Sequence, residues 1–200
     1  MSTQEIFQSA QEIIYLYQQH GNKDYIGEPV SQIEHMCQCA QLAENAGADD
    51  DVVLAAFFHD IGHLCEFAFP EKKTQHMDNV GVVDHEKLGA EYLLNKGFSK
   101  KIVKLVQSHV AAKRYLTYHC PEYYNKLSDS SKKTLQFQGG VMASEEAIAF
   151  KSDDLFDLYV SIRKWDDLAK KTAQALPDLE HYRHMMIEHL SQQIIRNISL

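Results

Sequence analysis

Apolar residues recur every three or four positions along most of this chain, the spacing that places them on one face of an α-helix. The first such stripe contains Ile6, Ile13, Ile14 and Tyr17. The second contains Ile33, Met36, Cys37, Ala40 and Ala43. No segment shows the alternating pattern of a half-buried β-strand. The pattern therefore predicts an all-α protein.

Turn and capping residues divide these stripes into separate helices. Gly47 can end the second helix in a left-handed conformation, and residues 49–51 supply an N-cap and an acidic first turn for a third helix that reaches about Leu64. Further helices are expected at 84–97, from Ser99 to His109, in a short segment after Pro121, and at 128–138, 153–171 and 179–198. Residues 22–29 and 66–83 are expected to be loops. The second loop is long enough to suggest a functional role.

The size and charge of the chain narrow its class. A chain of 200 residues suits one domain. We expect this domain to span 1–200, with its core at about 24–170 and a C-terminal helix at about 178–198. With 20 basic and 28 acidic residues the net charge is −8, which gives no general reason to bind nucleic acid or an anionic membrane. A small anionic substrate is still compatible, because a local pocket can be positive.

The sequence also lacks membrane and export signals. No apolar run approaches the ~18 residues that a transmembrane helix needs, and the first residues lack the basic and then apolar pattern of a secretory signal. The four cysteines form no Cys-x-x-Cys pair, as expected for reduced side chains in the cytoplasm. We therefore expect a cytoplasmic protein with no membrane partner; nothing in the sequence sets its oligomeric state.

A histidine next to an aspartate, His59-Asp60, ends the apolar run of the third helix. His35 precedes this pair, and His85 and His109 follow it at nearly equal intervals. Imidazole nitrogens and carboxylate oxygens bind iron, manganese or zinc, and antiparallel helices can bring such residues to one inward-facing site. Taken singly, each histidine is as well explained by burial or helix capping. Their recurrence on successive helices favours a metal centre.

Five ligands are too many for one open catalytic ion, so the pattern favours two ions. A further carboxylate is needed, and Asp166 is chosen because it lies in a long amphipathic helix; the neighbouring Asp167 is expected to face solvent. His63 can reach the same cavity without binding metal. The other histidines are interpreted as loop residues (His20, His76 and His119) or as a solvated face of the last helix (His181, His184 and His189).

Segments around these residues resemble the HD-domain superfamily, most of whose members are metal-dependent phosphohydrolases. The ligand order His…His-Asp…His…His…Asp is similar to that of its mixed-valence diiron oxygenases, with the phosphonate-cleaving branch nearest and myo-inositol oxygenase more distant. The resemblance covers residues 24 to about 166. Its specific segments are 24–28, 32–35, 59–63, 85–90, 109–115, 127–140 and 163–166. The loop at 64–84 is longer than the branch leads us to expect, and its role is left open.

The resemblance implies a diiron centre of mixed valence, Fe(II) and Fe(III), with dioxygen as co-substrate. One iron would bind three of the residues and the other would bind two, with an aspartate bridging. The first set would be His35, His59 and Asp166, the second His85 and His109, and the bridge Asp60.

The resemblance also implies a substrate pocket. Tyr25 would occupy an open iron position until substrate displaces it, Glu28 would meet a substrate amine, and His63 would lie beside the substrate. The residues around the phosphonate group would be Lys113, Ser131, Thr134, Gln138 and Arg163. The residue types agree with these roles, because a phosphonate needs cations and neutral donors, and arginine offers a bidentate fork.

The implied reaction is the oxygen-dependent cleavage of the carbon–phosphorus bond of a 1-hydroxy-2-aminoalkylphosphonate. The simplest case is (2-amino-1-hydroxyethyl)phosphonate, which would give glycine and phosphate. Three alternatives remain open from the sequence: the same chemistry on a trimethylammonio analogue, a metal-dependent phosphohydrolase of the HD type, and a non-enzymatic module with a vestigial core.

Overall fold

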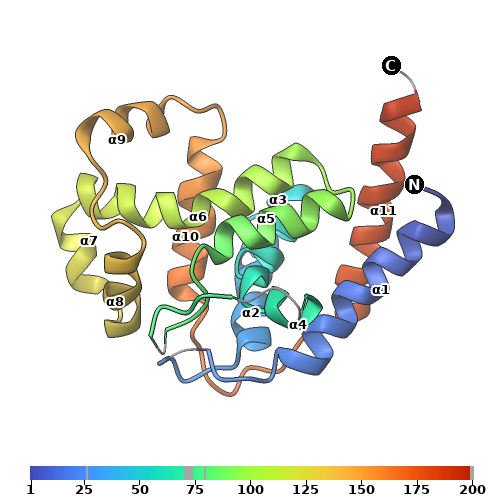
Figure 1. Ribbon diagram of the computed structural model, residues 1–200, viewed down its shortest axis with the longest axis horizontal. Coiled ribbons are helices and arrows are strands. Elements are labelled where there is room, and N and C mark those ends of the chain that lie inside the picture. The colour runs from blue at the N-terminus through green and yellow to red at the C-terminus, as the bar shows by residue number, and fades with distance from the viewer. Residues whose placement is uncertain (26, 70–73, 79, 199–200) are drawn as a thin grey trace.

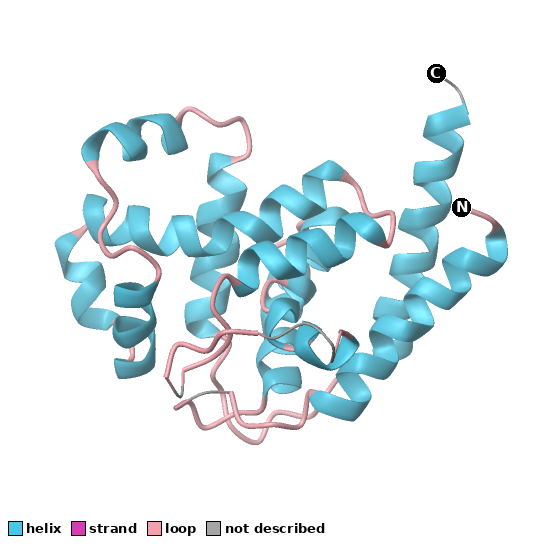
Figure 2. Ribbon diagram, viewed as in Figure 1, coloured by secondary structure: helices cyan, strands magenta, loops and turns pink. Residues whose placement is uncertain are grey.

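The computed structural model describes the chain except residues 26, 70–73, 79 and 199–200, with the backbone alone at 197–198. Ile26 and part of the 64–84 loop therefore lie outside the described residues. Every regular element in the described ranges is a helix (Figure 2), which confirms the all-α prediction. In chain order these are α1 (Thr3–His20), α2 (Gln32–Asn45), α3 (Asp50–Phe58), the 3₁₀ turn η1 (Ile61–His63), α4 (Cys65–Ala68), α5 (His85–Asn95), α6 (Lys100–His119), α7 (Pro121–Lys126), α8 (Asp129–Phe137), α9 (Ser144–Lys151), α10 (Phe156–Leu168) and α11 (Leu179–Ile198).

The centre of the molecule is a group of packed helices in which α3 contacts α2, α6 and α10, and α5 lies along α6. Figure 1 shows α1 and α11 side by side at one end and α7, α8 and α9 at the other. The site residues come from the central helices and from the loops that join them. The architecture thus places the candidate ligands inside the bundle.

Most of helix α3 is deeply buried, because Val52 to Phe58 are all in the core. Its last turn is held from both sides: Tyr17 of α1 donates its hydroxyl to the Phe57 carbonyl at 2.7 Å, and Tyr182 of α11 stacks on the Phe57 ring at 4.3 Å. Burial of each large apolar side chain stabilises the fold by about 1.5–3 kcal/mol. This packing determines where the chain emerges from α3, and His59 is the next residue.

Gly62 allows η1 to lie directly against the start of α5. A Cβ atom at this position would fall 1.8 Å from the backbone oxygen of His85, so any other residue would push the two segments apart. The contact brings Asp60 and His85 together, although they lie 25 positions apart in the sequence. The glycine of the His-Asp-Ile-Gly segment therefore has a direct role in shaping the site.

The predicted helix boundaries are right where capping residues mark them and wrong at several other positions. Gly47 is left-handed (φ +73°), and Asp49 and Ser99 cap α3 and α6. The third helix, however, ends at Phe58 rather than Leu64, because the close packing at Gly62 tightens the chain into a 3₁₀ turn. A short α4 follows that the sequence did not predict.

The predicted helix at 153–171 spans Phe156–Leu168, and a separate helix, α9, precedes it. Asp153 separates the two, since its carboxylate accepts a hydrogen bond from the Leu155 amide at 2.9 Å. Helix α9 was missed because it has almost no apolar stripe: Ala147 is its one buried residue.

His189 corrects the interpretation of the last helix as having a solvated histidine face. Its side chain is buried. The Nε2 atom accepts from the Ser99 amide at 3.1 Å, and Nδ1 lies 2.8 Å from the Asp51 carboxylate. His189 therefore docks α11 onto α3 and α6, while His181 and His184 are exposed as expected. Two histidines interpreted as loop residues, His20 and His119, instead end α1 and α6.

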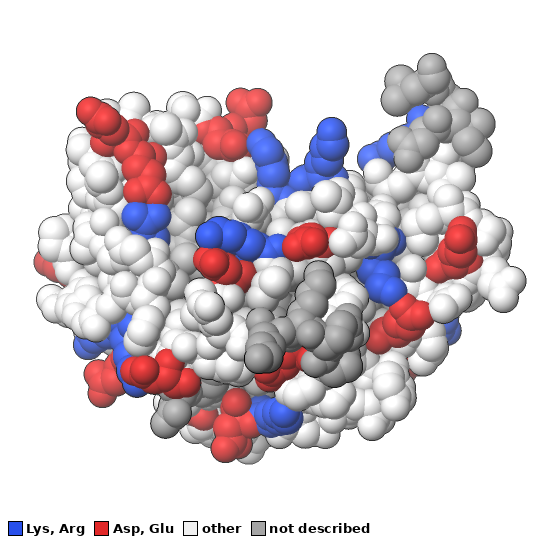
Figure 3. All heavy atoms as spheres, in the orientation of Figure 1, with Lys and Arg blue, Asp and Glu red and all other residues white. Residues whose placement is uncertain are grey.

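The described helices include none that is long and apolar enough to cross a membrane. On the face shown in Figure 3, acidic and basic side chains are interspersed and form no continuous basic surface. Of the four cysteines, Cys120 is exposed and the other three are buried.

Candidate metal centre

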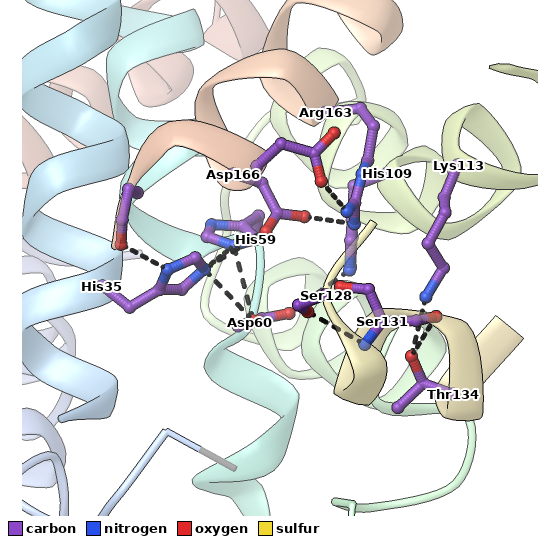
Figure 4. A network of polar contacts seen from close by, with 12 residues as sticks. His35, His59, Asp60, His109, Lys113, Ser128, Ser131, Thr134, Arg163 and Asp166 are labelled. Carbon is purple, nitrogen blue, oxygen red and sulfur yellow. Dashed lines mark hydrogen bonds and ion pairs between the residues drawn. The ribbon is translucent and has the colours of Figure 1, made fainter. Parts of the chain in front are cut away.

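All six residues that the sequence predicts as ligands converge at the centre of the bundle. His35 lies in the first turns of α2, and His59 and Asp60 follow α3 directly. His85 opens α5 and Asp166 lies near the end of α10. His109 lies in the middle of α6, which corrects the expectation that it ends a helix. Figure 4 shows the His35 and His59 rings on one side of Asp60 and the side chains of Lys113 and Thr134 on the other.

The two oxygens of Asp60 face different pairs of histidines. Oδ2 lies 3.7 Å from His35 Nε2 and 3.4 Å from His59 Nε2. Oδ1 lies 3.3 Å from the Nε2 atoms of both His85 and His109. This arrangement makes two groups that can hold a metal ion, one of His35, His59 and Asp60 and one of Asp60, His85 and His109. They share the Asp60 carboxylate, which suits a dinuclear site.

Asp166 completes the first group. Its Oδ1 atom lies 3.4 Å from His35 Nε2 and 4.0 Å from His59 Nε2. The other carboxylate oxygen accepts from the Arg163 guanidinium at 2.6 Å. Arg163 therefore orients Asp166 toward the two histidines.

The hydrogen bonds of the four imidazoles orient their Nε2 lone pairs inward. In each ring Nδ1 lies near a backbone carbonyl, which places the proton on Nδ1 and leaves Nε2 free. The acceptors are Ala169 for His35 (2.9 Å), Ala56 for His59 (2.8 Å), Val106 for His109 (2.7 Å) and Val82 for His85 (3.3 Å).

Within each group the two Nε2 atoms are close, 3.0 Å apart for His35 and His59 and 3.1 Å for His85 and His109. Two inward lone pairs at this distance repel unless a cation lies between them. The residues present therefore fit a metal ion in each group, and a donor set of nitrogen and oxygen without thiolate suits iron, manganese or zinc.

The two aspartates are ionised despite their burial. Burial opposes the charge of Asp60, but His59, His109 and His85 outweigh it and hold its pKa well below the usual range. Burial likewise opposes the charge of Asp166, and Arg163 outweighs it, so that this pKa is also low. Both carboxylates are thus available as anionic ligands at neutral pH.

A narrow cavity of about 50 Å³ opens beside the metal groups. The eight residues for which the sequence predicts catalytic or substrate roles all line it, together with four of the candidate ligands. The eight are Tyr25, Glu28, His63, Lys113, Ser131, Thr134, Gln138 and Arg163, and the four ligands are Asp60, His85, His109 and Asp166. Their shared location confirms that they line one pocket; that this pocket binds substrate, and their individual roles in it, stay predictions.

Among the described residues that line this cavity, Lys113 is the cation that has no carboxylate partner. It is buried, and its Nζ atom donates to the Thr134 hydroxyl at 2.9 Å. Burial and, after it, the nearby charge of Arg163 lower the pKa of Lys113 to about 7, against the opposing effect of the aspartates. A buried ammonium with no carboxylate partner can bind a small anion.

Arg163 is held by its own neighbours instead of being free. Besides Asp166, its guanidinium pairs with Asp167, and its Nε atom donates to the Tyr123 hydroxyl at 2.9 Å. Tyr123 in turn donates to Asp167 at 2.5 Å. Asp167 therefore does not face solvent as expected; it holds the arginine in place.

Two aromatic rings cover the metal groups. The Tyr25 ring stacks on His35 with centroids 3.8 Å apart, and the His63 ring stacks on His85 at 4.0 Å. His63 Nδ1 accepts from the Val82 amide at 3.1 Å. Burial and the neighbouring His85 hold the pKa of His63 well below its usual range. His63 is therefore neutral, with its remaining proton on Nε2.

The structure adds residues that sequence reasoning missed. Lys170 donates to Glu28 at 2.6 Å, and Tyr123 supports Arg163. Glu86 is buried, and its Oε2 atom has no hydrogen-bond partner and lies 3.8 Å from His85 Nδ1. No local pattern could have identified Lys170, because 142 residues separate it from Glu28. Glu86 could have been noticed as the carboxylate next to a predicted ligand.

Comparison with known proteins agrees with this site. Residues 33–155 match the HD domain family. The chain is 43% identical over 189 residues to an uncharacterised protein of Acanthamoeba polyphaga mimivirus (94% of this chain, 85% of that one). It is 36% identical over 171 residues to the 1-hydroxy-2-(trimethylamino)ethylphosphonate dioxygenase (glycine-betaine-forming) of Leisingera caerulea (86% and 85%), and 36% identical over 173 residues to the hydroxymethylphosphonate dioxygenase of Gimesia maris (86% and 83%). The chain therefore belongs to the HD-domain family, in which its relatives include two phosphonate dioxygenases.

Proposed function

We propose that the protein is an oxygen-dependent diiron oxygenase that cleaves the carbon–phosphorus bond of a 1-hydroxy-2-aminoalkylphosphonate. The simplest substrate is (2-amino-1-hydroxyethyl)phosphonate, with glycine and phosphate as products. The observation that carries the proposal is the pair of ligand groups joined by Asp60 and opening on a cavity that holds both Lys113 and Glu28. Relatives named for two different phosphonates support the reaction class.

The phosphonate binds at the end of the cavity formed by α6 and α8. Lys113 supplies the charge, and the hydroxyls of Thr134 and Ser131 and the amide of Gln138 supply neutral donors. Arg163 is paired with two aspartates, so its guanidinium is not free to bind the phosphonate through two hydrogen bonds. It contributes only the positive potential of its charge. A buried cation and neutral donors together replace the water that a phosphonate loses on binding.

Glu28 and Tyr25 face the other part of the substrate. The carboxylate of Glu28 lines the cavity and can accept from a substrate ammonium. Tyr25, stacked on His35, covers the metal group of α2 and α3 and has to move when substrate takes its place. Burial raises the pKa of Tyr25 well above the usual range, so the phenol is neutral when no metal ion is bound.

Bound iron would supply oxygen activation and one-electron chemistry at the carbon that carries the hydroxyl. The protein positions the substrate for it. His63, neutral and beside His85, offers its Nε2 proton as a hydrogen-bond donor to the reacting oxygens, and the buried walls of the cavity exclude water from them.

The proposed reaction balances with one dioxygen. The C1–H and C1–P bonds break, and C1 is oxidised from an alcohol to a carboxylate. Glycine and phosphate together contain two more oxygen atoms than the substrate, which dioxygen supplies as it is reduced. No further reductant is needed.

The test is phosphate and glycine release from (2-amino-1-hydroxyethyl)phosphonate by the iron-loaded protein, with and without dioxygen. We expect the products to appear together, in a one-to-one ratio, and only when dioxygen is present. Undiminished phosphate release under anaerobic conditions would contradict the proposal. Oxygen-independent hydrolysis of phosphate esters with manganese would instead identify a phosphohydrolase.

A further inference from the structure

Glu28 is not a free carboxylate. Its Oε1 atom accepts from the Lys170 ammonium at 2.6 Å, and the same ammonium lies 3.3 Å from the Ser128 hydroxyl. The Glu28 side chain is 9% exposed and that of Lys170 is 18% exposed. An ion pair this well shielded is not screened like a surface pair. Whatever binds to Glu28 must therefore share it with, or take it from, Lys170.

The contact joins three segments around the cavity. Glu28 belongs to the loop before α2, Ser128 caps α8, and Lys170 follows α10. The loop can approach α8 because Gly27 has a positive φ of +71° and no side chain: a Cβ atom there would lie 2.1 Å from the Ser130 hydroxyl. The close approach of this loop to α8 thus places Glu28 near Ser128, where the Lys170 ammonium contacts both side chains.

We propose that Lys170 is a specificity-determining residue that makes Glu28 selective for a primary ammonium group over a trimethylammonium group. This inference rests on the proposed function. A primary ammonium has three N–H donors and can replace the hydrogen bond of Lys170 on the carboxylate. A trimethylammonium has none, so it cannot displace Lys170 and must bind close to a second positive charge.

The rest of the cavity agrees with this assignment. Proteins bind quaternary ammonium groups mainly with several aromatic faces arranged around the charge. Apart from histidines, Tyr25 is the single aromatic side chain among the described residues that line this cavity, and its ring is stacked on His35. The cavity is also narrow, at about 50 Å³. The relative from Leisingera caerulea is named for a trimethylamino substrate, so the two chains are inferred to differ at this end of the pocket.

The test measures binding in the absence of dioxygen, so that no substrate is consumed. Calorimetry with the iron-loaded protein gives the dissociation constants of the 2-amino and 2-trimethylammonio forms of 1-hydroxyethylphosphonate. Each constant is divided by that of hydroxymethylphosphonate, and the preference is the comparison of these two ratios. Wild type is expected to prefer the amino form by about tenfold or more, which corresponds to the contribution of one hydrogen bond to a charged group. In Lys170→Met the trimethylammonio form gains more than the amino form, and the preference falls to within about threefold.

Two further variants separate selectivity from damage to the fold. Lys170→Arg keeps the charge and donors and should keep the preference. Lys171→Met changes the adjacent exposed lysine and should leave both ratios as in wild type. An unchanged preference in Lys170→Met, or an equal change in Lys171→Met, would overturn the role of Lys170 while leaving the oxygenase proposal intact. Failure of all three phosphonates to bind wild type would overturn the proposed function, and the role of Lys170 with it.

Discussion

The two halves of the metal centre use the same kinds of ligand but differ in their surroundings. We call His35, His59 and Asp166 the sealed side and His85 and His109 the open side; Asp60 belongs to both. Neither imidazole of the sealed side lines the cavity, whereas both imidazoles of the open side do.

The outer hydrogen bonds differ at one imidazole, His85, because His109 of the open side is held as closely as the sealed side, with Nδ1 2.7 Å from the Val106 carbonyl. On the sealed side both Nδ1 atoms lie within 2.9 Å of a carbonyl, and Arg163 clamps Asp166. On the open side the contact from His85 to Val82 is 3.3 Å, with the unpaired Glu86 oxygen nearby at 3.8 Å. Ligand type alone therefore does not determine how tightly an ion is held or how easily it is reached. We infer that the open side exchanges its ion faster.

Removal of the shared ligand should have the largest effect, because it breaks both sides at once. Asp60→Asn loses the bridging anion, and we expect iron content to fall from two ions per chain to less than one. Oxygen-dependent phosphate release should fall by more than about a hundredfold, beyond the 10–100-fold typical of outer hydrogen-bond partners. Metal analysis and product assays measure this. Asp129→Asn, at a fully exposed carboxylate on α8, is the matched control; retention of both ions by Asp60→Asn would exclude a bridging role.

Arg163→Lys should reverse the order in which the two sides lose their ions to a chelator. A chelator is expected to remove iron from wild type in two phases, with the open side first. Lysine cannot contact Asp166, Asp167 and Tyr123 together as the arginine fork does, so affinity on the sealed side should fall by about 10–100-fold. The rates of chelation, followed by absorbance, would then show a new fast phase. An unaltered time course would mean that Arg163 does not support Asp166.

Glu86→Gln tests how firmly the open side holds its ion. A carboxylate near His85 Nδ1 increases the electron donation of that imidazole to a bound ion. Its neutralisation should speed the fast phase of chelation by several-fold, about tenfold at most, and leave the slow phase unchanged. If the proposed mixed-valence diiron centre is present, its electron paramagnetic resonance signal should shift as well. A change confined to the slow phase would contradict the assignment of Glu86 to the open side.

The pH dependence of substrate binding should give the smallest effect. With a pKa of about 7, Lys113 is charged below pH 7 and neutral above it, and an anionic phosphonate needs the charged form. The KM should therefore be lowest below pH 7 and rise above it, by at most about tenfold per pH unit. Steady-state kinetics from pH 6 to 8 measures this. Lys113→Met should bind weakly at every pH without this rise, and an identical pH profile in the variant would place the titration elsewhere.

Much of the fold and of the candidate site could be predicted from sequence because the signals are local. The spacing of apolar residues predicted α1, α2 and α11, and the polar residues directly before α3 and α6 predicted the caps at Asp49 and Ser99. The six candidate ligands were found because each lies on, or next to, a helix that such signals identify. The roles of the pocket residues came from resemblance and are still predictions.

The errors share one cause, which is dependence on partners distant in the chain. His189 was assigned to solvent because its partner Asp51 is 138 residues away. Asp167 was assigned to solvent although it holds Arg163, since a helical period cannot show which polar side chain receives a buried cation. Helix α9 has no stripe to detect, and α3 ends early because of one backbone contact at Gly62.

The sequence by itself determined the helical class, most helix starts and the chemical type of the site, since periodicity, capping and the supply of imidazoles and carboxylates are properties of short segments. The tertiary structure alone decided that Asp60 divides its two oxygens between the histidine pairs, that one pair faces the cavity, and that Lys170 lies on Glu28. These depend on distances between residues far apart in the chain, which are set only when the helices pack.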